Sequence, residues 1–177
     1  MFNQFNFFFS DCKRMLGKNK ARIIILWMSR TFVGCFVYRF ERALFLFFGN
    51  KYKYIRIVFY PFINLLQVYT NMDIHYRADI KGGLLILHPA MGIVISGKVT
   101  IGKNLTLVGG NVIGFSTGIN NPFIIGNNCS LGANAVIIGP IILEDEIKIG
   151  ASACVIKNCI NKGVTLVGVP AKEINKA

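Results

Sequence analysis

Two histidines are the residues of this sequence best suited to moving a proton near neutral pH. His88 lies in ILHPAMGIVI, a run that is otherwise apolar, and His75 lies thirteen residues upstream. A neutral imidazole has an unperturbed pKa of about 6.5, so it can act as a general base toward a hydroxyl group. A lone histidine before a proline is also a common structural residue. The residue by itself therefore leaves a catalytic and a structural role open.

Cysteine chemistry is the second possibility, and its pattern is uninformative. The five cysteines lie at positions 12, 35, 129, 154 and 159, and none forms a CxxC pair. We therefore expect neither a zinc site nor a disulfide framework, and no metal cofactor. Reduced thiols are typical of a cytoplasmic protein.

A six-residue period runs through the part of the chain that must position His88. Every sixth residue from Ile95 to Val155 is aliphatic, eleven in a row, and glycine directly follows several of them. Ile74, Ile80 and Ile86 precede this run with an offset of three residues. The period fits neither an α-helix nor a plain strand. It fits a solenoid of hexapeptides with one inward aliphatic residue per face, and residues 74–160 would form about five coils.

Residues 1–72 differ from the rest in charge and aromatic content. They hold eleven Lys and Arg against two acids and nineteen of the 22 aromatic residues, whereas residues 73–177 carry a net charge of +3. We divide the chain into a basic aromatic helical segment, residues 1–72, and a repeat domain with a C-terminal tail, residues 73–177. Two or three amphipathic helices are expected over about 20–48 and 55–70, with an interruption at Gly49-Asn50.

The hydropathy of the chain bears on whether it contacts or spans a membrane. A hydrophobic fraction of 53% and a mean hydropathy of +0.51 suggest an oligomer interface, a membrane-facing surface or both. The longest uncharged stretch of the aromatic segment, residues 57–72, has sixteen residues, which is too short to span a bilayer. No nucleic-acid-binding motif accompanies the positive charge, and the N-terminus does not resemble a signal peptide. We expect a cytoplasmic protein with peripheral contact to the inner membrane face through residues 1–72.

Three elements in order resemble the hexapeptide-repeat acyltransferases: the repeats, the segment DIHYRADIKGGLLILHPAMGIVIS and the ending VGVPAKEI. The most similar branch is the serine acetyltransferase type and its relatives in polysaccharide gene clusters. The resemblance covers about residues 70–175. It implies a mainly β fold, a left-handed parallel β-helix with an α-helical N-terminal segment. It also implies a homotrimer, with acetyl-CoA in a groove between adjacent subunits.

The resemblance places the catalytic base at His88 and its orienting carboxylate at Asp73. The chemistry of the two side chains agrees, because a carboxylate on the far ring nitrogen fixes the tautomer and stabilises the imidazolium. The two residues are fifteen apart, close to one turn of eighteen, so a solenoid could bring them together. An aspartate near a corner is also a common turn former. We expect His75 to be structural.

The same resemblance points to cofactor-binding residues, which are Ala133, Ala151, Lys157 and Lys172. The small alanines leave room for the pantetheine arm, and the lysines could meet CoA phosphates. Gly109 and Gly110 would let a substrate approach closely.

Two departures from the serine acetyltransferase pattern concern the acceptor. That branch has an Asp directly before the catalytic His, where this chain has Leu87. It also has a second His before a proline in the outward loop, GFSTGINNPF at 114–123, where this chain has Asn121. Such a loop is a common place for binding residues, and Ile119 within it keeps the period by accident. An amino-acid ammonium would lose a carboxylate partner at Leu87, whereas an uncharged polyol would lose less.

These departures favour an acetyl-CoA-dependent O-acetyltransferase that acts on a sugar hydroxyl or a lipid-linked oligosaccharide in surface-polysaccharide biosynthesis. Transfer would be direct, because no serine or cysteine is placed as a covalent relay. The alternatives are a serine O-acetyltransferase of cysteine biosynthesis, a sugar N-acetyltransferase and a non-catalytic trimeric β-helix scaffold.

Overall fold

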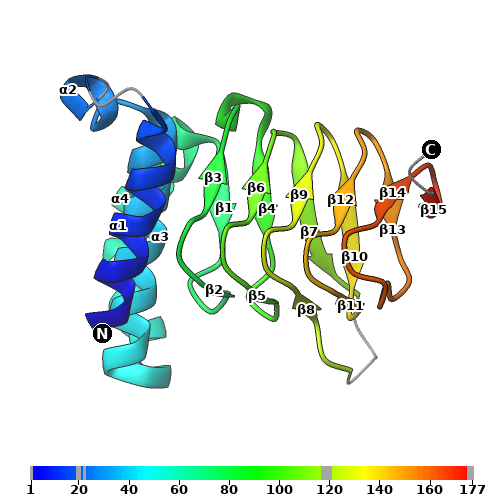
Figure 1. The fold of residues 1–177 in the computed structure, drawn as a ribbon. Coiled ribbons are helices and arrows are strands. Elements are labelled where there is room, and N and C mark those ends of the chain that lie inside the picture. The colour runs from blue at the N-terminus through cyan, green and yellow to red at the C-terminus, as the bar shows by residue number, and fades with distance from the viewer. Residues whose placement is uncertain (1, 19–20, 22, 117–120, 175–177) are drawn as a thin grey trace.

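The computed structural model describes residues 2–18, 21, 23–116 and 121–174. Figure 1 shows a solenoid of stacked coils with helices gathered at one end and β15 (Lys172–Ile174) at the other. The predicted left-handed parallel β-helix with an α-helical N-terminal segment is confirmed.

Among the described residues, four α-helices precede the strands: α1 (Phe2–Leu16), α2 (Ile23–Leu26), α3 (Arg30–Phe48) and α4 (Tyr52–Thr70). The two or three helices expected over about 20–48 and 55–70 correspond to α2, α3 and α4. The first range is divided because Ser29 starts α3 by accepting a hydrogen bond from the Phe32 N–H at 3.1 Å. α1 is a further helix that the sequence pattern did not indicate. The expected interruption is present: Gly49 ends α3 with φ 58, and the 3-10 turn η2 (Gly49–Lys51) leads into α4.

α4 ends at Thr70 and the first strand begins at Met72, so the helices and the coils are joined by Asn71 alone. Asn71 adopts a left-handed conformation with φ 56, which ends the helix at once. None of the helices in the described residues is long and apolar enough to cross a bilayer.

Three parallel sheets form the faces of the solenoid. The first face contains β1 (Met72–Ile74), β4 (Ile93–Ile95), β7 (Asn111–Phe115), β10 (Val136–Gly139) and β13 (Cys154–Val155). The second contains β2 (Asp79–Ile80), β5 (Thr100–Ile101), β8 (Ile124–Ile125) and β11 (Ile142–Leu143). The third contains β3 (Leu85–Ile86), β6 (Thr106–Leu107), β9 (Ser130–Leu131), β12 (Lys148–Ile149) and β14 (Thr165–Val167), and β15 (Lys172–Ile174) pairs antiparallel to β14.

The chain completes four full turns and a fifth that is reduced on the second face. There, a single bridge between Leu143 and Cys159 replaces a strand pair. This is close to the five coils predicted from the period.

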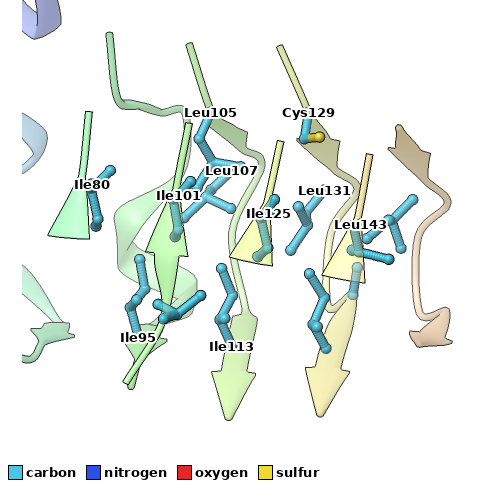
Figure 2. Close-up of a cluster of buried hydrophobic side chains, with 14 of the residues drawn as sticks. Ile80, Ile95, Ile101, Leu105, Leu107, Ile113, Ile125, Cys129, Leu131 and Leu143 are labelled. Atoms are coloured by element: carbon cyan, nitrogen blue, oxygen red, sulfur yellow. The ribbon is translucent and has the colours of Figure 1, made fainter. Parts of the chain in front are cut away.

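The period-six residues form the aliphatic core. Successive coils stack Ile95 on Ile113 on the first face, Ile101 on Ile125 on the second and Leu107 on Leu131 on the third. All six side chains are buried, and Figure 2 shows them pointing into the interior of the solenoid. Burial of this apolar surface, repeated in each coil, is the main stabilising contribution of the β-helix.

Two insertions interrupt the regular coils, and only the first of them shifts the period. The turn η3 (Pro89–Met91) adds three residues at the corner after β3, which accounts for the offset between Ile86 and Ile95. The loop after β7 adds six residues, because Ile113 and Ile125 occupy adjacent faces although they are twelve positions apart. An insertion of one whole hexapeptide leaves the period in the sequence unbroken. Ile119 lies outside the described residues.

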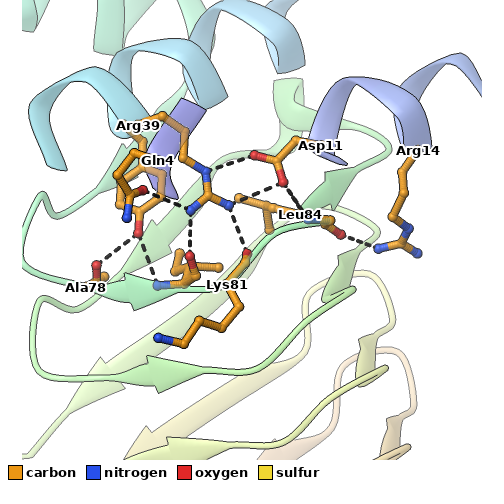
Figure 3. Close-up of polar contacts among 10 residues, drawn as sticks. Gln4, Asp11, Arg14, Arg39, Ala78, Lys81 and Leu84 are labelled. Atoms are coloured by element: carbon orange, nitrogen blue, oxygen red, sulfur yellow. Dashed lines mark hydrogen bonds and ion pairs between the residues drawn. The ribbon is translucent and has the colours of Figure 1, made fainter. Parts of the chain in front are cut away.

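The first coil has no preceding coil to satisfy its backbone groups, and the helices supply side chains instead (Figure 3). Arg39 donates to the carbonyl of Lys81 at 2.9 Å, and the Asp11 carboxylate accepts from the N–H groups of Gly83 and Leu84 at 2.7 Å each. Arg39 and Asp11 also form a buried ion pair at 2.9 Å. Further donors to carbonyls of this coil and its neighbour are Arg14, Thr31, Tyr38 and Arg42. The helices therefore close the open end of the solenoid.

Candidate active site

His88 lies at the corner between the third and first faces, directly before η3, and its side chain is exposed. Its backbone N–H donates to the Val108 carbonyl at 2.8 Å, and its carbonyl accepts from the Met91 N–H at 3.2 Å. The corresponding corner of the next coil, at Gly109, lies directly against His88. A Cβ added to Gly109 would come within 2.5 Å of the His88 carbonyl oxygen. The backbone of His88 is thus fixed while its imidazole stays open to solvent.

Asp73 is the central residue of β1, and it points outward between two buried neighbours. Its Oδ1 accepts a hydrogen bond from Nε2 of Gln67 in α4 at 3.3 Å. The last turn of the helical segment therefore contacts the carboxylate that the sequence analysis assigned to orient the base.

The structure brings the start of β1 and the His88 corner to the same edge. Asn71 donates from Nδ2 to the Ala90 carbonyl at 2.9 Å, and its own carbonyl accepts from the Ile93 N–H at 3.0 Å. Within the described residues, however, no hydrogen bond or ion pair joins the Asp73 carboxylate to the His88 ring. Asp73 and His88 therefore come from elements that meet at one edge, but their side chains are not a bonded pair in this chain.

A column of corners continues from His88 along this edge. The Asn134 N–H donates to the Gly109 carbonyl, and the Ser152 N–H donates to the Ala133 carbonyl, both at 2.8 Å. The corners that hold Ala133 and Ala151 therefore stack in register beyond the Gly109 turn. Lys172 follows the last corner of the column, where the Ala171 N–H donates to the Cys154 carbonyl at 2.8 Å.

Two other predicted residues lie elsewhere. Asn121 belongs to the loop that leaves the far edge of the first face, and Lys157 follows β13 at that same edge. Both are exposed. Within one chain, the width of the first face separates them from the His88 column, so the structure does not gather all the predicted residues into one site.

Leu87 is exposed beside His88, and it lines a hollow of about 250 Å³. Met15 of α1 and Leu26 of α2 also line this hollow. The helical segment therefore reaches the side of the candidate acceptor site where the serine acetyltransferase pattern has a carboxylate.

His75, the other histidine, is held by packing and a local hydrogen bond. Its ring stacks on Tyr76 with centroids 4.5 Å apart, and its Nδ1 accepts from the Arg77 N–H at 3.1 Å. Burial, together with the positive charges of Arg56 and Arg77, lowers the pKa of His75, while Asp73 acts in the opposite direction. These contacts fit the structural role expected for it.

The buried cysteine thiols are poor nucleophiles. Burial raises the pKa of Cys129 to about 11, and it raises the pKa of Cys35 well above its usual range. All five cysteines are free. Across the described part of the chain, no cluster of His, Cys, Asp and Glu could hold a metal ion.

Sequence reasoning missed Gln67 and Asn71, which connect α4 to the site. At the end of α4, the Gln67 side chain donates a hydrogen bond to Asp73, and the Asn71 side chain donates one to the Ala90 carbonyl in η3. A polar Gln and Asn directly before the first aliphatic repeat were the available signal.

The chain is similar to known serine acetyltransferases. It is 40% identical over 111 residues to that of Buchnera aphidicola, an alignment covering 60% of this chain and 41% of that relative. It is 32% identical over 163 residues to that of Helicobacter pylori, covering 90% of this chain and 89% of that relative. The chain belongs to the serine acetyltransferase family.

A solved serine acetyltransferase from Neisseria gonorrhoeae superimposes with a TM-score of 0.80 at 26% identity, covering 98% of this chain and 67% of that one. No protein-family model matches the sequence. The family assignment confirms the resemblance to the serine acetyltransferase branch and the expectation of an acetyltransferase, and it disfavours a non-catalytic scaffold. It lends no support to a particular closeness to polysaccharide-cluster enzymes.

The predicted sugar O-acetyltransferase of surface-polysaccharide biosynthesis is wrong. The relatives and the structural neighbours are serine acetyltransferases, and they support the serine alternative instead. The error came from the weight placed on Leu87 and Asn121. Loss of two polar contacts weakens one way of holding an amino acid, but it does not define a different class of acceptor.

Proposed function

We propose that the chain is a serine O-acetyltransferase that transfers the acetyl group of acetyl-CoA to the side-chain hydroxyl of L-serine. The observation that carries the proposal is the similarity to the Helicobacter pylori serine acetyltransferase over 89% of that protein. A Neisseria gonorrhoeae serine acetyltransferase of the same fold, 26% identical, has been solved in complex with serine. Acetyl-CoA is a cytoplasmic metabolite, so the proposed reaction implies a cytoplasmic location.

His88 is the proposed general base. Its exposed imidazole takes the proton of the serine hydroxyl while the hydroxyl oxygen attacks the thioester carbonyl carbon. Collapse of the tetrahedral intermediate breaks the C–S bond, and the imidazolium returns the proton to the sulfur of CoA. Asp73 is proposed as the carboxylate that orients the imidazole, with Gln67 holding Asp73 in turn.

Direct transfer within a ternary complex requires no covalent acetyl-enzyme. The raised thiol pKa values of Cys35 and Cys129 support this, because thiolates are the nucleophilic form. The Gly109 turn against His88 leaves space that a side chain would otherwise fill.

The proposed CoA path follows the column of corners from His88. Ala133 and Ala151 are small residues that would border the pantetheine arm, and Lys172 at the far end would meet a CoA phosphate. A serine acetyltransferase of Brucella abortus with the same fold has been solved in complex with CoA.

We further propose that the chain acts as a homotrimer. Asn121 and Lys157 lie across the first face from His88, so they would reach a catalytic column only in an adjacent subunit. Mixing His88→Ala with Lys157→Glu subunits tests this arrangement. Mixed trimers should regain activity that neither variant has alone, whereas no recovery would place the whole site within one chain.

An acceptor assay tests the activity itself. Release of the CoA thiol from acetyl-CoA should depend on L-serine, and D-serine or free hexoses should not replace it. Turnover with a hexose but not with L-serine would overturn the proposal.

Leu87→Asp sharpens that assay, because it restores the carboxylate of the family pattern next to His88. It should lower the KM for L-serine by about five- to tenfold, as expected for a new pairing of the substrate ammonium with a carboxylate. Leu87→Asn, which has nearly the same shape without the charge, is the matched control. Equal KM values for the two variants would mean that the serine ammonium lies elsewhere.

A further inference from the structure

Helix α3 turns polar side chains inward and apolar side chains outward. The inward residues Tyr38, Arg39 and Arg42 are buried and donate to backbone carbonyls of the first coil. The outward residues Phe36 and Phe40 are 46% and 51% exposed. An ordinary surface helix has the opposite arrangement, with its apolar stripe toward the core. α3 therefore presents to its surroundings the kind of side chain that normally lies in a core.

Exposed aromatic residues of the neighbouring helices extend this surface. We call Phe5 of α1, Phe36 and Phe40 of α3, and Phe59 and Phe62 of α4 the outer aromatic face. Four of these residues, all but Phe5, line an apolar hollow of about 740 Å³ between α3 and α4, and Phe5 lines a smaller one between α1 and α3. The helices cover the end of the solenoid (Figure 1). Because Tyr38 and Arg39 of α3 bond to the first coil, the exposed Phe36 and Phe40 face away from it.

The charge of the helical segment is entirely positive at its surface. Its two acids, Asp11 and Glu41, are 0% and 3% exposed, and they pair with Arg39 and Arg56. The exposed charged residues of the described part of this segment are all basic: Lys13, Lys18, Arg30, Lys51 and Lys53.

The exposed basic residues lie at the two ends of the helices. Lys51 and Lys53 are at the connection between α3 and α4, and Lys18 and Arg30 are near α2 at the opposite end. Trp27, which follows α2, is 63% exposed at that end, and tryptophan is enriched at membrane–water interfaces. An apolar middle flanked by cations and an aromatic anchor matches the layering of a bilayer surface that contains acidic lipids.

We propose that the outer aromatic face binds the surface of a membrane that contains acidic phospholipids. The phenylalanine rings enter the acyl-chain boundary, and the basic residues at both ends contact lipid phosphates. The β-helix then stands away from the bilayer, with the His88 column open to the aqueous phase. A second copy of this chain suits the face less well, because two such surfaces would bring basic residues together without any exposed acid between them. This inference does not depend on which acceptor the enzyme uses.

Co-sedimentation of the full chain with vesicles tests the proposal. Binding to phosphatidylcholine mixed with phosphatidylglycerol should exceed binding to phosphatidylcholine alone, and added salt should weaken it. The double variant Phe40→Ser, Phe62→Ser should bind at least about tenfold more weakly, because both rings leave the apolar phase. The double variant Lys51→Gln, Lys53→Gln should bind the acidic vesicles about 25-fold more weakly, since each basic residue near such a surface contributes about fivefold.

The matched control is Ile160→Ser, which removes an apolar side chain that is 74% exposed at the far end of the solenoid. It should bind vesicles like the unaltered chain, and circular dichroism melting should show that all variants are folded. Absence of binding to acidic vesicles, or an equal loss in Ile160→Ser, would overturn the proposal. The proposal would also fail if Phe40→Ser, Phe62→Ser lowered the mass in sedimentation velocity while the unaltered chain ignored vesicles, because a second copy would then cover the face.

Discussion

The boundary between the helices and the first coil is built differently from the interior of the β-helix. Inside the coils, stacked aliphatic side chains such as Leu107 and Leu131 fill the core, and the strands bond to the coils on either side. At the boundary, the buried side chains include Asp11 and Arg39, and they bond to backbone groups. The comparison shows that a solenoid can extend itself with apolar residues alone, whereas its open end requires polar ones.

A consequence is that the helical segment cannot be regarded as a detachable addition. Its inward residues satisfy N–H and carbonyl groups of the first coil that would otherwise meet water or remain unpaired. Removal of residues 1–70 would therefore damage the β-helix as well as any membrane contact, so single substitutions are the better probes.

The largest expected effect is at the boundary. Arg39→Leu would leave the Asp11 carboxylate buried without its partner, and it would free the carbonyl of Lys81. The free energy of unfolding should fall by about 3–5 kcal/mol, measured by urea denaturation. Lys162→Met, which breaks the exposed pair with Glu146, is the control and should change stability by less than about 1 kcal/mol. Similar losses of unfolding free energy for the two variants would mean that the buried Arg39–Asp11 pair contributes no more to stability than an exposed ion pair.

Leu131→Ala probes the interior of the coils by the same measurement. The side chain is buried between neighbouring coils on the third face, and its truncation should cost about 2–5 kcal/mol through lost apolar burial and a residual cavity. Ile138→Ala removes an exposed aliphatic residue of β10 and should be nearly neutral. Comparable costs at the two positions would contradict the inward and outward assignment.

Gly109→Ala tests the corner that supports His88. Gly109 has φ 149, and an added Cβ would lie 2.5 Å from the His88 carbonyl oxygen. The strain should cost about 1–3 kcal/mol of stability, and displacement of His88 should reduce the rate of acetyl transfer more than stability alone explains. At Gly114, an added Cβ would find its nearest neighbour at 3.8 Å, so Gly114→Ala should be tolerated. Full activity in Gly109→Ala would show that this contact does not position the base.

The smallest expected effect is a pH dependence of stability from His75. Because its pKa is lowered in the folded chain, the folded state favours the neutral ring. The associated stability is present above the unfolded pKa of about 6.5 and is lost as pH falls from there toward the folded pKa. Thermal melts of the unaltered chain should show a small decline in this range that His75→Gln lacks. An identical decline in the variant would assign it to other groups.

The six-residue period was sufficient to predict the coils, because each inward position carries an aliphatic side chain. The same period could also have shown that the predicted cofactor-binding residues lie at two different edges of the first face. Ala133 and Ala151 each follow a third-face residue by two positions, whereas Lys157 follows the first-face residue Val155 by two. The boundary was not predictable in this way, since Asp11 and Arg39 are 28 positions apart and follow no period.

The acceptor was the part of the site least accessible to sequence reasoning. Leu87 and Asn121 are real departures from the family pattern, but their effect depends on what else surrounds the substrate. Leu87 lies beside a hollow formed partly by Met15 and Leu26 of the helical segment, and nothing in the repeat pattern indicated that those helices reach the site.

The two histidines give the most direct test of the proposed activity. The measurement is the rate of L-serine-dependent release of the CoA thiol from acetyl-CoA by the unaltered chain, by His88→Ala and by His75→Gln. We predict that His88→Ala loses at least about a hundredfold in rate, as expected when a general base is removed, while His75→Gln stays close to the unaltered chain. Equal rates in His88→Ala and His75→Gln, or release that does not depend on L-serine, would contradict the proposal that His88 activates the serine hydroxyl.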